Sequence, residues 1–253
     1  MKSKLFTAAL AALMLSSCTP KENGYFDNLP QEANPIEIGN KITNRFLEQG
    51  HSQYGSPLRV NEPRTQITYP DVCTWLGGLW FAQETDNKEL TERLKARFEP
   101  LFTNEAYLQP KPNHVDNNVF GAVPLELYLQ TGEERYKTLG MMYADSQWEL
   151  PANWKLKEGE ERQSSMYGDF KDADICQPEQ KEWADKGYSW QTRFWLDDMY
   201  MITTIQAQAY RVTNDRKYID RAAREMVLYL DSIQQTSGLF YHCLLYTSPS
   251  PRD

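Results

Sequence analysis

Two adjacent carboxylates, Asp197 and Asp198, stand in a run that is otherwise rich in aromatic and methionine side chains, QTRFWLDDMYM at residues 191–201. Consecutive residues of a helix point about 100° apart, so both carboxylates cannot face water if the run is buried. A carboxyl held among Trp, Phe and Met is desolvated, which favours its protonated form and suits a general acid. The alternative is that the two residues cap the start of a helix.

A third carboxylate, Asp116, lies in the segment NHVDNNVFG at residues 113–121, just before an apolar helix predicted over Val123–Leu129. Taken alone, an Asp in this position is typical of a helix cap. Together with Asp197 it makes a candidate pair of catalytic carboxylates. The sequence has no Cys and His spacing typical of a zinc site, so we expect neither a metal nor a cofactor.

The composition excludes two broad classes of protein. The 253 residues hold 27 Lys and Arg against 35 Asp and Glu, a net charge of −8, which is not the basic footprint of a nucleic-acid-binding protein. A mean hydropathy of −0.69 excludes a protein with several membrane spans. Seven Trp and 15 Tyr are typical both of sugar-binding surfaces and of helical cores.

Residues 1–17 read as an export signal. Two lysines precede an apolar run, Leu5–Leu15, that is too short to span a membrane. The ending Leu-Ser-Ser-Cys resembles a bacterial lipobox and predicts that Cys18 is lipidated; a cleaved signal followed by a chance Cys is the alternative. Residues 18–34 would then be a polar tether. We therefore expect a lipid-anchored protein of the bacterial cell envelope, periplasmic or at the outer membrane, that touches the membrane only through its anchor.

The remaining residues, 35–242, show apolar side chains at helical spacing and no convincing alternation typical of strands. The helical segments run through residues 38–46, 72–80, 90–98, 123–129, 136–148, 194–210 and 218–233. An insertion, Leu150–Ser189, lacks a helical period and is rich in charged and aromatic residues. A loop of that length is usually functional or disordered, and we expect it to be partly ordered and near a site.

A repeated turn organises the predicted helices. Its three copies begin at Thr85, Thr131 and Thr213. Each copy follows the end of an apolar helix, supplies a candidate N-cap, and opens a charged helix whose apolar residue comes five after the threonine. Repeated helical hairpins of this size are typical of helical solenoids and α/α toroids. The sequence therefore predicts an all-α protein.

Four segments resemble, in order, the successive motifs of the unsaturated uronyl hydrolases, glycoside hydrolase families 88 and 105. They are YPDVCTWLGGLW at 69–80, the run 114–128, RFWLDDMYM at 193–201 and GLFYH at 238–242. The Trp-x-Asp-Asp-x-Tyr-Met run is the most specific, and it is more similar to family 105, the unsaturated rhamnogalacturonyl hydrolases. The resemblance covers about Pro35 to His242.

The resemblance implies an (α/α)6 barrel that removes a Δ4,5-unsaturated uronic acid from the non-reducing end of lyase-generated oligosaccharides of the pectin or rhamnogalacturonan type. By analogy, Asp197 protonates C4 of the enol ether and then helps water to add at C5. Asp116 is the second carboxylate, and it positions water or sugar hydroxyls. Asp198 has no role in the match, and we expect it to make a structural hydrogen bond. The matched substrate-contacting positions are Tyr69, Trp195 and His242.

Two other functions are compatible with the same residues. The protein could be another (α/α)6 enzyme, a polysaccharide lyase or an inverting glycosidase. It would then use a different catalytic site, and the role of Asp197 would be structural. A helical, aromatic-rich lipoprotein that binds glycans without chemistry would lose only affinity when Asp197 is changed.

The last residues, 243–253, follow no earlier period and hold two prolines within three residues. They resemble a peptide seen where a metagenomic reading frame runs into sequencing-adaptor DNA, so we expect a foreign tail. The barrel would then be incomplete at its C-terminus, and we expect the 253-residue chain as written to be poorly folded and inactive. The predicted function is that of the parent enzyme.

Resequencing tests whether the tail is foreign, because a genomic stop codon directly after Asp253 would contradict a foreign origin. A cooperative thermal transition of the monomer would contradict the expected poor folding.

Overall fold

The structure is a computed structural model whose described residues are 29–51, 65–150, 155–156, 175–176 and 178–243. The predicted signal at 1–17, Cys18, most of the tether and the tail after Cys243 lie outside these residues. The chain forms two compact units, residues 1–42 and 43–253. In the described part of the first unit, the 3₁₀ helix η1 (Gln31–Ala33) precedes the start of helix α2 (Pro35–Glu48), where Oδ1 of Asn34 accepts a hydrogen bond from the amide of Ile36 at 2.9 Å.

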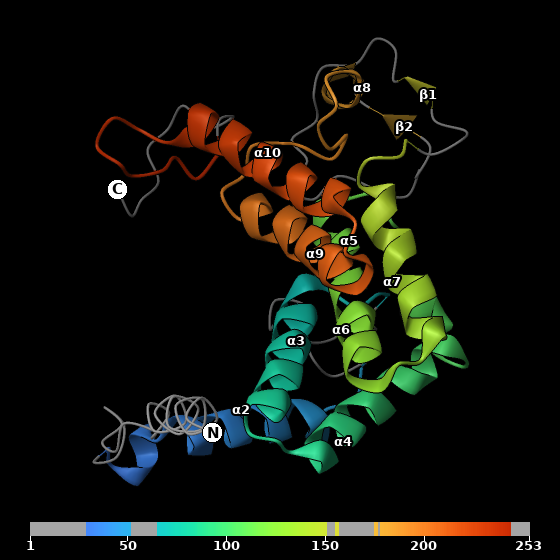
Figure 1. The fold of residues 1–253 in the computed structure, drawn as a ribbon, viewed down its shortest axis with the longest axis vertical. Helices are drawn as coiled ribbons and strands as arrows, with labels where there is room; N and C mark the ends of the chain where they lie inside the picture. Colours follow the sequence, from blue (N-terminus) through green and yellow to red (C-terminus); the bar gives the residue numbers. More distant parts are fainter. Residues whose placement is uncertain (1–28, 52–64, 151–154, 157–174, 177, 244–253) are drawn as a thin grey trace, which may run out of the picture. The chain divides into compact units, whose positions relative to one another are not determined.

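Three helical hairpins dominate the second unit (Figure 1). They are α3 (Tyr69–Glu84) with α4 (Lys88–Phe98), α6 (Ala122–Thr131) with α7 (Glu134–Ser146), and α9 (Asp198–Thr213) with α10 (Arg216–Ile233). The shorter elements are η3 (Glu99–Phe102), η4 (Ala106–Leu108), α5 (Val115–Asn118), η5 (Val119–Gly121), α8 (Pro178–Asp185) and a parallel pair, β1 (Lys155–Leu156) with β2 (Ile175–Cys176). The predicted all-α class is confirmed. Within the described ranges, no helix has the length and apolar character needed to cross a membrane.

The repeated turn has one geometry in all three hairpins. The hydroxyls of Thr85, Thr131 and Thr213 each donate a hydrogen bond of 2.7 Å to the carbonyl four residues earlier. The residue after each threonine adopts the left-handed backbone: Asp86 at φ 48°, Gly132 at 75° and Asn214 at 54°. The apolar residue five after each threonine is buried: Leu90, Tyr136 and Tyr218. The predicted repeat is therefore a structural one, and it reverses the chain between the two helices of each hairpin.

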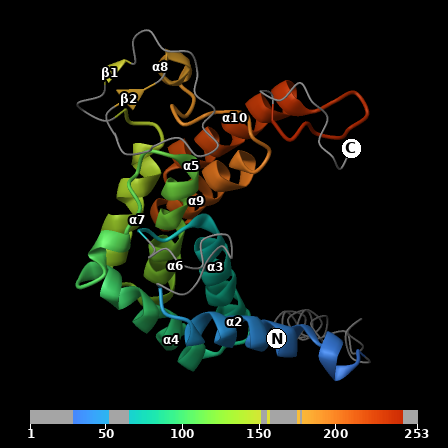
Figure 2. The ribbon, with the colours of Figure 1, turned by 180° about the vertical axis from the view of Figure 1, so that it is seen from behind.

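Helix α6 packs against both α3 and α9, so that one helix of each hairpin contributes to a common interior (Figures 1 and 2). Aromatic rings fill the space between the first two hairpins. Phe98 stacks on Phe120 with ring centroids 5.6 Å apart, and Phe120 meets Tyr143 edge to face at 5.2 Å. All three side chains are buried, so a share of the aromatic excess serves helix packing.

The sequence predicts no helix in the insertion Leu150–Ser189, and this expectation is wrong for α8. Proline at the first position and the i,i+4 ion pairs Lys181–Asp185 and Glu182–Lys186, each 2.5 Å long, support two helical turns without an apolar period. The insertion's aromatic residues Trp154, Tyr167 and Phe170 lie outside the described residues.

Two glycines bring α7 against the run that leads from α5 into α6. A Cβ atom added at Gly140 would lie 2.5 Å from Cγ of Leu125 and 2.8 Å from the carbonyl oxygen of Gly121. Both distances are too short for ordinary contact. The absence of a side chain at Gly140 therefore sets how closely the two elements approach.

Replacing Gly140 with Ala should lower the free energy of unfolding by about 1–3 kcal/mol, because the added methyl group overpacks this contact. Gly77→Ala is the matched control: apart from its chain neighbours and the backbone of its own helix, no atom lies within 4 Å of its added Cβ, and alanine favours a helix over glycine by about 1 kcal/mol. Urea denaturation of the two variants checks the difference. Equal effects of the two substitutions would contradict the close approach.

Candidate active site

The predicted site residues stand at the N-terminal ends of the interior helices. Tyr69 begins α3, Asp116 lies in α5 at the head of the run into α6, and Asp197 immediately precedes α9. Helix α5 packs against α9 (Figure 2). Burial raises the pKa of Tyr69, and the negative charges of Asp116 and Asp197 raise it further. Residues that are far apart in the sequence therefore lie within electrostatic reach of one another.

Arg193 lies at the centre of this cluster. Its Nε donates to Oδ1 of Asp198 at 2.8 Å, and its Nη1 lies 2.8 Å from Nε2 of His114. Its Nη2 donates to Oδ1 of Asp116 at 3.0 Å. One guanidinium thus connects the segment before α9 with two residues at the start of α5. Its side chain is only 16% exposed.

Asp198 is fully buried and makes the structural hydrogen bonds expected of it. Besides Arg193, it accepts hydrogen bonds from the hydroxyl of Tyr229 at 3.1 Å and the amide of Trp195 at 3.3 Å. Burial raises the pKa of Asp198 to about 6; Arg193 opposes this rise, and the charges of Asp116 and Asp197 add to it. Asp198 therefore holds the segment in place from inside the protein.

Helix α9 begins at Asp198, so the helix start expected at Phe194 is wrong. Phe194 has a left-handed backbone, φ 58°, which turns the chain so that the side chain of Arg193 reaches Asp198. Such a backbone costs a bulky residue about 1–3 kcal/mol. Three contacts hold it: the Phe194 ring packs on Trp183 and Tyr229 with centroids 5.2 and 5.1 Å away, and its amide donates to the Tyr229 hydroxyl at 3.3 Å.

Asp197 occupies the N-cap position of α9 but does not act as a cap. Its φ of −68° and ψ of −21° are helical, and its side chain accepts no capping hydrogen bond, whereas N-cap residues usually have an extended backbone. Its Oδ1 is buried and has no hydrogen-bond partner among the described residues. A buried acceptor without a partner costs about 1–3 kcal/mol. The free oxygen of Asp197 therefore points to a ligand.

Asp116 is held by Arg193 and remains partly accessible, with 30% of its side chain exposed. Burial raises the pKa of Asp116; Arg193 lowers it, and the charge of Asp197 raises it again. Its neighbour His114 is the N-cap of α5 and accepts a hydrogen bond from the Asp116 amide. Burial and the charge of Arg193 hold the pKa of His114 well below its usual range, so the ring is neutral. A neutral imidazole has a single acceptor nitrogen, so the tautomer decides whether the ring accepts from the Asp116 amide at Nδ1 or from the guanidinium at Nε2.

The predicted substrate-contacting residues are also accessible. Tyr69 is 39% exposed. The Trp195 ring meets the His242 ring edge to face, with centroids 5.3 Å apart, and the carbonyl of His242 accepts from the amide of Leu196 at 2.9 Å. Cys243, predicted to belong to the tail, is buried and forms an isolated antiparallel bridge with Trp195. The structure thus brings His242 to the segment that carries Asp197.

Sequence reasoning did not assign roles to Arg193, Tyr229 or Tyr200. Arg193 stands in the motif RFWLDDMYM at 193–201. If this run were one helix, Arg193 would be five residues from Asp198 and would point to a different side of the helix. Tyr229 belongs to the apolar side of α10 and carries no separate signal. Tyr200 follows Asp197 by one turn, is 39% exposed and hydrogen-bonds with the thiol of Cys73.

A second buried carboxylate, Glu126, lies in the interior away from this cluster. It accepts hydrogen bonds from Trp80 at 3.0 Å and Gln208 at 2.7 Å, and it pairs with Arg211 at 2.5 Å. Hydrogen bonds satisfy this carboxylate fully, which fits a structural role. Among the described residues, no group of three or more His, Cys, Asp or Glu side chains is placed to hold a metal ion.

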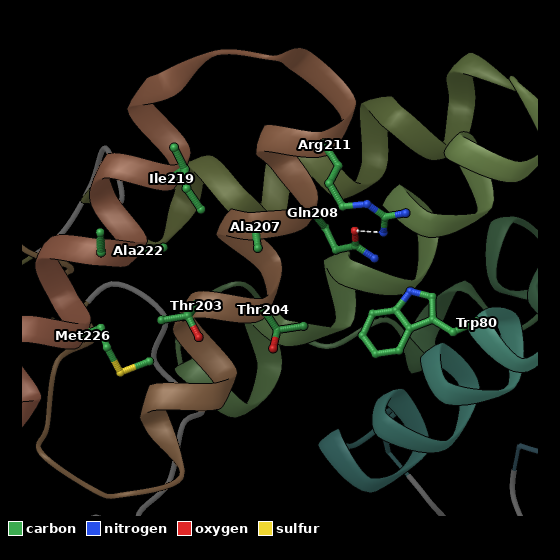
Figure 3. A pocket seen from close by; sticks show the side chains of 10 residues that line it. Trp80, Thr203, Thr204, Ala207, Gln208, Arg211, Ile219, Ala222 and Met226 are labelled. Carbon is green, nitrogen blue, oxygen red and sulfur yellow. Dashed lines mark hydrogen bonds between the residues drawn. The ribbon is translucent and has the colours of Figure 1, made fainter. Parts of the chain in front are cut away.

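A hollow of about 430 Å³ lies beside this second network (Figure 3), and neither Asp116 nor Asp197 lines it. Residues of α3, α9 and α10 line it: Trp80, Thr203, Thr204, Ala207, Gln208, Arg211, Ile219, Ala222, Ala223 and Met226. Most of this surface is apolar, so it suits contact with another apolar surface and not an anionic sugar.

The model of glycosyl hydrolase family 88 matches residues 38–252. The chain belongs to this family. The family 88 fold is an (α/α)6 toroid, to which the three helical hairpins correspond, and the protein is a glycoside hydrolase that acts on oligosaccharides bearing an unsaturated uronic acid. The matched range extends into residues 243–253, whose foreign origin stays a prediction. No curated protein matches the sequence.

The segment that carries Arg193 in this family 88 hydrolase is anchored to α10 by Glu225. Glu225 is buried, and it accepts hydrogen bonds from the amide of Ser189 at 3.2 Å and from the hydroxyl of Thr192. Burial raises the pKa of Glu225 to about 7, partly offset by these hydrogen bonds. The folded protein therefore holds this proton more tightly than the unfolded chain does.

Glu225 should make the protein less stable as pH rises. Because its folded pKa of about 7 exceeds the ordinary value of 4.5, its stabilising contribution is complete below pH 4.5 and is lost as pH rises through 7. Glu225→Gln does not titrate, so its free energy of unfolding should fall less than that of the wild type between pH 5 and pH 8. Urea denaturation at both pH values measures this, and parallel losses would contradict it.

Proposed function

We propose that this hydrolase removes a Δ4,5-unsaturated uronic acid from the non-reducing end of lyase-generated oligosaccharides by hydrating the enol ether. Asp197 delivers a proton to C4, and positive charge develops at C5 and the ring oxygen. Water then adds at C5 and gives its proton to Asp197. The resulting hemiketal opens to a C5 ketone and releases the leaving sugar from C1.

The unpaired Oδ1 of Asp197 is the observation that carries this proposal. The buried carboxylates around it, Asp198 and Glu225, are fully engaged in hydrogen bonds with the protein. Among the carboxylates of the described residues, Asp197 alone combines a buried, unpartnered oxygen with a position beside the accessible Tyr69 and Asp116. A proton donor needs an oxygen that no protein hydrogen bond occupies, and Oδ1 of Asp197 meets that requirement.

Asp116 is proposed to position the attacking water or the sugar hydroxyls. Arg193 engages its Oδ1, and the partial exposure of the side chain allows a further hydrogen bond from the site. Tyr69, Trp195 and His242 are proposed to contact the sugar, since aromatic faces pack against its apolar C–H groups. The likeness of the Trp-x-Asp-Asp-x-Tyr-Met run to family 105 favours uronides of the pectin or rhamnogalacturonan type.

The chemistry of Tyr69 argues against the lyase alternative. A lyase needs a base that removes the proton from C5 of a uronide, and tyrosinate is one such base. Burial and the charges of Asp116 and Asp197 raise the pKa of Tyr69, which disfavours its ionised form. Arg193 is engaged by protein acceptors and is poorly placed to neutralise the uronate.

Asp197→Asn should strongly reduce the rate of turnover. With the full-length protein from the complete genomic reading frame, the ultraviolet absorbance of unsaturated oligogalacturonide or rhamnogalacturonide should fall, and the variant should lose about 10²–10⁴-fold in rate. Asp220→Asn is the control, because Asp220 pairs with Arg216 on the exposed side of α10 and its change should leave the rate intact.

Each other outcome of this assay contradicts the proposal in a different way. A rise in absorbance with the wild type would indicate a lyase. Binding without any change in absorbance would indicate a glycan-binding protein. A fully active Asp197→Asn variant would place the proton donor elsewhere.

We also propose that the protein is anchored in the bacterial cell envelope through a lipid on Cys18. The export signal and the Leu-Ser-Ser-Cys sequence support this. Labelled fatty acid should be incorporated into the wild type and not into Cys18→Ser. Equal labelling of both proteins would contradict it.

A further inference from the structure

We propose that Arg193 is a positioning residue for the reaction: it fixes Asp116 relative to Asp197 and supplies the positive charge that faces Asp116, without touching the substrate. This inference rests on the proposed function of the same site. Four features of the structure support it: the direction of the guanidinium contacts, their burial, the balance of charge and the chain segments that they connect.

The three guanidinium nitrogens contact acceptors on two separate parts of the fold. Nε and Nη2 contact Asp198 at the start of α9, whereas Nη1 contacts His114 and Nη2 also contacts Asp116 at the start of α5. A guanidinium is planar and presents its donors in a fixed fork. The angle between these contacts therefore sets where Asp116 lies relative to the segment that carries Asp197.

The same contacts leave little of the guanidinium for a substrate. Each nitrogen is already directed at a protein acceptor, and only 16% of the side chain is exposed. The guanidinium also lies over the Trp195 ring, with Cζ 5.3 Å from the centroid, so a second side of the group is covered by protein. Arg193 is thus arranged to organise the site and not to capture the uronate.

The charges around Asp116 make this arrangement necessary. The groups that face it are Arg193, His114, Tyr69, Asp197 and Asp198. Arg193 is the cation among them, and both aspartates disfavour the negative charge of Asp116. Without Arg193, Asp116 would bind a proton more readily and would lose the charge that strengthens the hydrogen bonds it accepts from water or sugar.

The test compares Arg193→Lys and Arg193→Ala with the wild-type full-length protein on unsaturated oligogalacturonide. Lysine keeps the charge but cannot hold three acceptors at once, so both variants should lose kcat by at least about 10²-fold, as a misplacement of 1 Å can cost. KM should change far less than kcat. The pH at which activity is half lost on the acid side should rise most in Arg193→Ala.

Two further measurements separate positioning from a merely structural role. Guanidinium chloride at concentrations that do not unfold the protein should restore part of the activity of Arg193→Ala, whereas an equal concentration of urea should not. Arg211→Ala is the matched control, because Arg211, on α9, also pairs with a buried carboxylate, Glu126, outside the site. It should lower the melting temperature but leave the pH profile unchanged.

Three results would overturn the inference. A rise in KM with kcat unchanged would make Arg193 a substrate-binding residue. If the pH profile were unaltered in Arg193→Lys and Arg193→Ala, the role of Arg193 would be structural. The same conclusion would follow if Arg211→Ala altered the pH profile equally. Full activity of Arg193→Lys would show that the charge alone suffices. Failure of the proposed function would be seen in a different measurement: the wild-type protein itself would be inactive on every unsaturated uronide.

Discussion

The buried ion pair between Arg193 and Asp198 is the interaction on which the rest of the site depends. Asp198 is fully buried at the start of α9, and removing a carboxylate from water is costly unless it is paired and hydrogen-bonded. Arg193, the Tyr229 hydroxyl and the Trp195 amide supply those partners. Breaking such a pair by removing one partner leaves an uncompensated buried charge, so the pair fixes the segment that also carries Asp197.

The helical hairpins supply the framework that this ion pair requires. Each hairpin turns at a threonine that closes one helix and a left-handed residue that reverses the chain. The same construction repeated three times brings the N-terminal ends of α3, α5 and α9 to one region. The close approach at Gly140 then holds the run from α5 into α6, and with it Asp116. The chemistry therefore depends on helix ends whose positions are fixed by packing elsewhere.

The sequence predicts the all-α class and the repeated turn, because apolar periodicity and turn chemistry are local properties. It places the start of α9 four residues too early, since the left-handed backbone at Phe194 is imposed by tertiary contacts with Trp183 and Tyr229. The roles proposed for Asp116 and Asp197 come from family motifs. The part played by Arg193 is hidden from sequence reasoning because its acceptors, His114 and Asp116, are distant in the chain.

The central claim is that the reaction begins with proton transfer to C4, and hydrolysis in deuterated water tests it most directly. Proton transfer from the exchangeable carboxyl of Asp197 should place one deuterium on a single face of C4. Proton NMR of the product at early times would show this as the loss of one of the two C4 signals. A cleaved product in which C4 carries no deuterium, or carries it on both faces from the start, would contradict the account.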